Sequence, residues 1–107
     1  MSDAFYNSLA SDATATLKEF GQKLQIQQPA SAAKVDFYGV REKTVKTVFD
    51  SMSKVRVGDI IYILEASATP EEGGRLNDRS ESFVIIHPEP IKPAGVTVAW
   101  QVTVRHG

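Results

Sequence analysis

The sequence predicts a mainly β protein, a small antiparallel β-barrel or sandwich of about five or six strands with an N-terminal α-helix. The clearest evidence is strict alternation near the C-terminal end, where Val96, Val98, Trp100, Val102 and Val104 occupy every second position. Successive side chains of a strand point to opposite faces, so this run predicts a half-buried strand. Several other short apolar runs precede it, separated by segments that contain Gly and Pro. Short strands in close succession are typical of barrels and sandwiches.

The composition narrows the class of protein. The 107 residues are expected to form one domain, and the absence of cysteine excludes disulfides, thiol catalysis and Cys-based zinc sites. A net charge of −1 argues against nucleic-acid binding as the main task, because phosphate neutralisation needs a basic surplus. The longest strongly apolar run, residues 60–64, is far shorter than the roughly 20 residues that span a bilayer. We therefore expect no membrane segment, and no signal peptide.

Residues 3–20 are expected to form a helix, because apolar residues recur there at spacings of three and four. Gly21 follows the last of them and is suited to ending a helix. The apolar stripe is narrow, and it fits either a helix docked on one side of a sheet or a helix packed against a neighbouring subunit. It consists of Phe5, Leu9, Ala13, Leu17 and Phe20.

The rest of the chain, residues 23–105, is expected to form the barrel. Residues 23–28 alternate and predict a first strand that ends at Pro29. Residues 29–41 are then expected to form a long loop, and loops of this size tend to be functional or mobile. Its aromatic residues either tuck onto the core or contact a partner. The candidates for contact with a partner or a channel in this loop are Asp36, Phe37, Tyr38 and Gly39.

Further strands are expected to complete the barrel. They are predicted over residues 42–52, 55–66, 75–77 and 82–87. Gly58 and Asp59 are expected to make a turn or bulge at the start of the second of these. Residues 60–64 are apolar on both faces, which implies a central strand covered on two sides. The prolines at positions 88, 90 and 93 suit an extended connection or an edge strand.

The predicted core and the second candidate loop follow from the same pattern. The core is expected to contain Leu24, Ile61, Ile63, Val98, Trp100 and Val102. Residues 68–74 are expected to form a loop, and its candidates for partner contact are Pro70, Glu71 and Glu72.

No arrangement of residues predicts catalysis. The two histidines lie in no metal-binding spacing, no serine lies in a GxSxG turn, and no phosphate-binding loop is present. We expect no enzyme activity, no cofactor and no metal site. A basic cluster, Lys43, Lys46, Lys54 and Arg56, is expected to be a mixed solvated surface, because Glu42, Asp50 and Asp59 offset its charge.

The ordered features resemble the small head-closure (stopper) and head–tail joining proteins of tailed bacteriophages. The resemblance runs from the N-terminal helix to the end of the chain. Its most specific parts are the strand of residues 57–64, the loop and Gly-Arg-Leu step of residues 66–76, the apolar strand of residues 83–86, and the Pro-Ile-Lys-Pro-Ala-Gly turn with the closing strand of residues 90–105. One departure is that Gly74-Arg75-Leu76 lacks the Asp that is usual between the Gly and the Arg.

The resemblance implies a structural protein of the virion neck, made in the cytoplasm of the host bacterium. It implies that copies form a ring below the portal or adaptor protein, close the DNA exit and offer a surface to a tail terminator or tail-tube protein. Double-stranded DNA would pass without specific binding, which a near-neutral chain suits. Deleting residues 30–38 is expected to leave the domain folded while impairing neck assembly or DNA retention.

Two other functions compete with this one. A tail terminator or tail-completion protein shares the small-ring architecture and is hard to separate by sequence. A small barrel that binds single-stranded nucleic acid would instead display aromatic residues on a basic groove. Trp100 lies in the alternating apolar set with four valines, which favours a place in the core over such a groove.

Trp100→Ala is expected to lower the free energy of unfolding by about 3–5 kcal/mol, as truncations of buried aromatic residues do. Urea denaturation of the two proteins measures this difference. A loss below about 1 kcal/mol would instead assign Trp100 to a surface or an interface.

Overall fold

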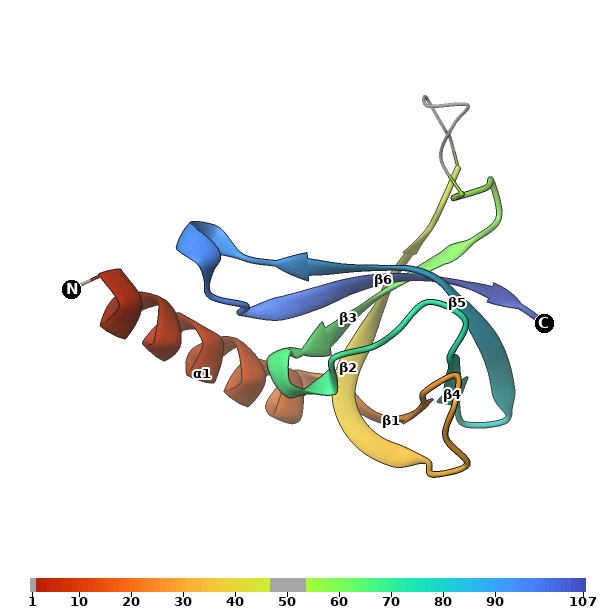
Figure 1. Ribbon diagram of the computed structural model, residues 1–107, viewed down its shortest axis with the longest axis horizontal. Coiled ribbons are helices and arrows are strands. Elements are labelled where there is room, and N and C mark those ends of the chain that lie inside the picture. The colour runs from red at the N-terminus through yellow and green to blue at the C-terminus, as the bar shows by residue number, and fades with distance from the viewer. Residues whose placement is uncertain (1, 47–53) are drawn as a thin grey trace.

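One helix packs on a closed six-stranded antiparallel β-barrel in the computed structural model, which describes residues 2–46 and 54–107 (Figure 1). The strands follow one another around the barrel in the order β1-β2-β3-β6-β5-β4. The predicted fold class, including the N-terminal helix, is therefore confirmed. The elements are α1 (Ser2–Phe20), β1 (Gln22–Gln27), β2 (Val35–Thr44), β3 (Ile60–Glu65), the 3₁₀ turn η1 (Ala66–Ala68), β4 (Arg75–Asp78), β5 (Glu81–Ile91), the 3₁₀ turn η2 (Pro93–Gly95) and β6 (Ala99–His106).

Side chains from alternate strand positions fill the barrel. Because strand residues alternate between two faces, each strand sends every second residue inward. Trp100 packs against the buried cluster while staying partly exposed, and its Nε1 donates a hydrogen bond to the Ala66 carbonyl at 3.0 Å. The buried cluster consists of Leu24, Ile26, Ile60, Tyr62, Leu64, Ala68, Leu76, Phe83, Ile85, Val102 and Val104.

Strand β3 is apolar on both faces, as predicted, but the interior takes the opposite set of residues. Ile60, Tyr62 and Leu64 belong to the interior cluster, so Ile61 and Ile63 lie on the outer face. Ile61 is nevertheless buried, and on that face it lines a hollow together with Val45, Val55 and Thr103. The expectation that Ile61 belongs to the core is confirmed by its burial, whereas Ile63 is only half-buried, and both lie outside the interior cluster. A run that is apolar on both faces carries no sign of which face is the inner one.

The expected long loop of residues 29–41 is wrong, because its second half is strand β2. Val35 to Gly39 pair with β1, and Gly39 to Thr44 pair with β3. Gly39 lies where neighbouring strands approach closely, since a Cβ there would come within 2.6 Å of the Ile63 carbonyl oxygen. The deletion of residues 30–38 would consequently remove barrel wall. We now expect it to unfold the domain.

The longest connection between strands lies instead between β2 and β3. The strand expected over residues 42–52 ends at Thr44 in the structure, and residues 47–53 of that prediction lie outside the described residues. Two backbone hydrogen bonds extend the pairing beyond the strand ends, from Val45 N to Asp59 O and from Gly58 N to Val45 O. Gly58 has a φ of 97° in the turn that precedes β3, so the predicted turn is confirmed.

Strand β5 is longer than predicted because it continues through two prolines. Pro88 and Pro90 pair with Val102 and Trp100 of β6. The pairing of β4 with β5 extends only to Val84, so the later part of β5 has a strand neighbour on one side. A strand edge of this kind tolerates proline, which has no N–H to donate.

Arg79→Gly is expected to raise the free energy of unfolding by about 0.5–1 kcal/mol. Arg79 lies in the turn between β4 and β5 with a φ of 56°, a conformation that glycine adopts without strain. Thermal or urea denaturation measures the gain. Ser80→Gly, in the same turn but outside the positive-φ region, serves as the control and should be neutral or slightly destabilising. A loss of stability in Arg79→Gly would contradict the expectation.

Candidate functional site

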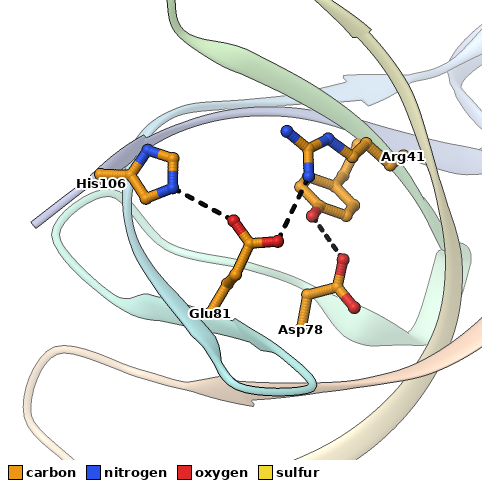
Figure 2. A network of polar contacts seen from close by, with 5 residues as sticks. Arg41, Asp78, Glu81 and His106 are labelled. Atoms are coloured by element: carbon orange, nitrogen blue, oxygen red, sulfur yellow. Dashed lines mark hydrogen bonds and ion pairs between the residues drawn. The ribbon is translucent and has the colours of Figure 1, made fainter.

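A cluster of polar side chains closes one end of the barrel (Figure 2). Arg41 from β2 and His106 from β6 both contact Glu81 at the start of β5. The distances are 3.5 Å from Arg41 Nη1 to Glu81 Oε1 and 3.2 Å from His106 Nε2 to Glu81 Oε2. The ring of His106 also packs on Phe83, with ring centroids 4.6 Å apart. The cluster therefore joins three strands at the barrel end.

The inner part of this cluster is a buried hydrogen bond. Tyr62 Oη donates to Asp78 Oδ2 at 2.6 Å, and both residues are buried. Burial raises the pKa of the Tyr62 phenol well above its usual value, and the bond to the Asp78 carboxylate raises this pKa further. Tyr62 thus stays protonated and donates this hydrogen bond, and its role is to stabilise the barrel.

The outer part of the cluster is open to solvent. The side chains of Arg41, Glu81 and His106 are 41%, 43% and 67% exposed. Exposed ion pairs contribute little to stability, about 0–1 kcal/mol. Within residues 2–46 and 54–107, no group of three or more His, Asp and Glu side chains is arranged to hold a metal ion. We therefore interpret this cluster as the polar closure of the barrel end.

A second polar arrangement holds the segment that leads into β3. The buried Asp59 carboxylate accepts hydrogen bonds from Arg105 Nε at 2.7 Å, from Arg105 Nη2 at 2.8 Å and from the Arg56 N–H at 2.8 Å. Arg105 Nη2 also donates to the Lys54 carbonyl at 3.2 Å. A two-pronged pair of this type fixes geometry as well as charge. The segment of residues 54–59 is thereby tied to the outer face of β6.

The charge of Asp59 is stabilised at this position. Burial alone would raise its pKa, but the hydrogen bonds and positive charge of Arg105, together with the Arg56 N–H, hold the pKa of Asp59 below its usual value. Asp59 is therefore ionised at neutral pH and committed to Arg105.

The ion pair between Asp59 and Arg105 changes the interpretation of the basic cluster. The sequence suggests that Asp59 offsets Lys43, Lys46, Lys54 and Arg56, whereas its carboxylate pairs with Arg105. Lys54 pairs with Glu72 at 2.7 Å, and Arg56 is exposed and makes no ion pair among the described residues. Among the described residues, Lys43, Lys46 and Arg56 of this cluster therefore have no ion-pair partner.

Beside this segment runs an open groove on the outer face of β5 and β6, which we name the β5–β6 groove. Val84 and Ile86 of β5 contribute apolar surface, and three cationic side chains with one carboxylate surround it. The groove is defined here by Lys54, Arg56, Glu72, Val84, Ile86 and Arg105. Its combination of cations and aliphatic surface suits a partner that is both acidic and apolar.

The structure separates the candidate residues of the first predicted loop. Asp36 is exposed on β2, whereas Phe37 packs against the interior cluster and Gly39 is buried in the barrel wall. Tyr38 is partly buried, and the Lys18 ammonium lies 6.0 Å from its ring centroid. The expectation that residues 36–39 form an exposed loop is wrong, because they belong to strand β2 and alternate residues face opposite sides, whereas their contact with a partner stays a prediction.

The second predicted loop is divided in a similar way. Pro70 is buried, Glu71 is exposed, and the exposed Glu72 forms the ion pair with Lys54. Of the expected core, Leu24 and Val102 lie in the interior cluster, and Val98 is buried just before β6 begins.

Two features of the surface escape sequence reasoning. Arg105 and Asp59 are 46 residues apart, and only the pairing of β3 with β6 brings them together. Phe20 belongs to the apolar stripe of the helix but is 75% exposed, whereas Leu17 of the same stripe is buried. The sequence pattern treats Leu17 and Phe20 alike and gives no signal of this difference.

No protein-family model matches the chain, and no curated protein matches its sequence. Within the part of the chain that the structure describes, no helix is both long and apolar enough to cross a membrane.

Asp59→Asn is expected to lower the free energy of unfolding at pH 7 by about 2–4 kcal/mol, because Arg105 loses its buried carboxylate partner. The pKa of Asp59 is depressed in the folded state, so the stability that it contributes is present above the unfolded-state pKa and is lost as the pH falls through the folded-state value. The difference in stability between the two proteins should therefore begin to shrink below about pH 4 and disappear once the pH is below the depressed folded-state pKa of Asp59. Urea denaturation between pH 7 and pH 2 measures both effects.

The exposed Glu71 provides the control for that experiment. Glu71→Gln should leave the stability near its wild-type value at every pH. Equal stability of wild type and Asp59→Asn at pH 7 would show that the pair with Arg105 contributes nothing.

Proposed function

We propose that the protein is a structural subunit of the neck of a tailed bacteriophage, a head-closure (stopper) protein. In this role, copies form a ring below the portal or adaptor protein, retain the packaged DNA and provide the surface to which the tail attaches. The observation that supports the proposal most is the closed barrel itself. The segments that resemble the family form its strands β3, β4, β5 and β6 in sequence order, joined by η1 and η2.

The packing of the barrel supports a role in assembly. The interior is filled by side chains, so ligands and partners meet the outer surface. That surface carries large hydrophobic side chains that are more than half exposed, Phe20 and Val57. A partner that covers these side chains would remove their apolar surface from water, which would favour its binding.

The aromatic residues support this role over binding of single-stranded nucleic acid. Tyr62 and Phe83 are buried inside the barrel, and Phe37 and Trp100 pack against the same cluster. A barrel that stacks bases displays such rings to solvent instead. The net charge of −1 also suits a ring through which double-stranded DNA passes without specific binding.

Deleting the gene from the phage that encodes this protein tests the proposal. We expect heads that package DNA but do not retain it, together with separate tails of normal length, and a plasmid-borne copy should restore infectious particles. Normal yields from the deletion phage would overturn the proposal. Heads that retain DNA together with tails of abnormal length would assign the protein to the tail terminator class instead.

A further inference from the structure

The end of helix α1 presents a fixed apolar side chain to solvent. Phe20 is the last residue of α1 and, at 75% exposure, the most exposed large hydrophobic residue among those that the structure describes. Glu19 beside it is exposed and makes no ion pair within the described residues. The helix end thus offers an aromatic ring and a free carboxylate together.

The barrel wall holds this helix end in place. Gly21 N donates to the Leu17 carbonyl at 2.8 Å and ends the helix. A Cβ at Gly21 would come within 2.6 Å of the Gly39 carbonyl oxygen, so the chain lies directly against strand β2 at this point. Because Leu17 is buried and Gly21 is pinned, the backbone that carries Phe20 loses little freedom when a partner binds.

The β5–β6 groove has complementary properties. Val84 and Ile86 give it aliphatic surface, and Arg56 is the cation there that no described carboxylate pairs with. The bonds from Arg105 to Asp59 and to the Lys54 carbonyl hold its rim in place. A Phe ring packs well on aliphatic side chains and beside an Arg, and a free carboxylate suits Arg56.

The two features lie on opposite sides of the barrel. In the closed order β1-β2-β3-β6-β5-β4, strand β5 is three positions from β2 in either direction. The helix end is pinned to β2, and the groove lies on β5 and β6. Helix α1 and the C-terminal end of β6 accordingly lie toward opposite sides of Figure 1. One copy therefore cannot fill its own groove with its own helix end.

We propose that Phe20 and Glu19 of one copy bind in the β5–β6 groove of the next copy. Different patches on opposite sides of a subunit produce a heterologous contact, which closes into a ring when the rotation between copies allows it. The contact pairs Glu19 with Arg56 and places Phe20 against Val84 and Ile86. This inference rests on the proposed ring and names the surfaces that form it.

Cysteine cross-linking on phage heads tests the contact directly, because the chain has no cysteine of its own. The protein is added to heads purified from the deletion phage, and binding to the heads is measured first. A variant with both Glu19→Cys and Arg56→Cys is then added and oxidised. We expect a ladder of covalent multimers on a denaturing gel, because each bond joins two copies. The single variants should give no ladder.

A matched pair provides the control. Glu71→Cys combined with Glu19→Cys places the second thiol at an exposed loop residue outside the proposed contact, and it should give no ladder. If the wild-type protein does not bind the heads, the proposed function fails and the contact fails with it. If the double variant binds the heads but yields no ladder, the ring stands and the proposed contact is overturned.

Substitutions provide an independent measurement that does not rely on oxidation. Phe20→Ala should weaken binding to the heads by about tenfold or more while leaving the melting temperature of the free protein unchanged, because the ring is mostly exposed. Val35→Ala, a truncation at another half-exposed position, should bind normally. Glu19→Arg and Arg56→Glu should each weaken binding, and the double charge exchange should restore it. Wild-type binding by Phe20→Ala would overturn the contact.

Discussion

The short pairing between β1 and β4 closes the barrel, and every other part of the structure depends on it. Only residues Gln25–Gln27 and Arg75–Asn77 take part, yet they remove the free edges that an open six-stranded sheet would have. Closure also sets the curvature that directs one face of each strand into a common interior. The filled interior, the helix on the outside and the opposite positions of β2 and β5 are all consequences of that closed order.

Much of the fold could be predicted from local patterns, and the failures have specific causes. Strict alternation identifies the strand that contains Trp100, and the Gly58 turn marks the approach to β3. Residues 35–41 of strand β2 escaped prediction because the buried Gly39 has no side chain to signal burial, and because a bulge between Arg41 and Lys43 breaks the alternation. A second bulge, between Ile85 and His87, breaks the pattern of β5. An extra residue in a strand therefore shifts the alternation, so the pattern on one side of a bulge does not predict which residues point inward on the other side.

The candidate surface was harder to predict than the fold, because it depends on which charges are already engaged. In the sequence, Asp59 counts against its basic neighbours. In the fold, the pairing of β3 with β6 brings Arg105 to Asp59, and no carboxylate in the described part of the chain forms an ion pair with the nearby Arg56. The same limitation applies to the helix, where the apolar stripe contains both the buried Leu17 and the exposed Phe20. Burial along a short helix depends on the shape of the wall that it meets.

The two prolines in β5 limit association of this protein through the free edge of that strand. Beyond Ile85, which still bonds to Gly73 and Gly74, the strand has a strand neighbour on one side only, so its other edge is the place where a foreign strand would pair. Pro88 and Pro90 have no N–H to offer such a strand, which interrupts the ladder of hydrogen bonds that aggregation through sheet edges needs. Copies of the chain at high local concentration are therefore kept from joining edge to edge there, and association is left to the more selective contacts between side chains.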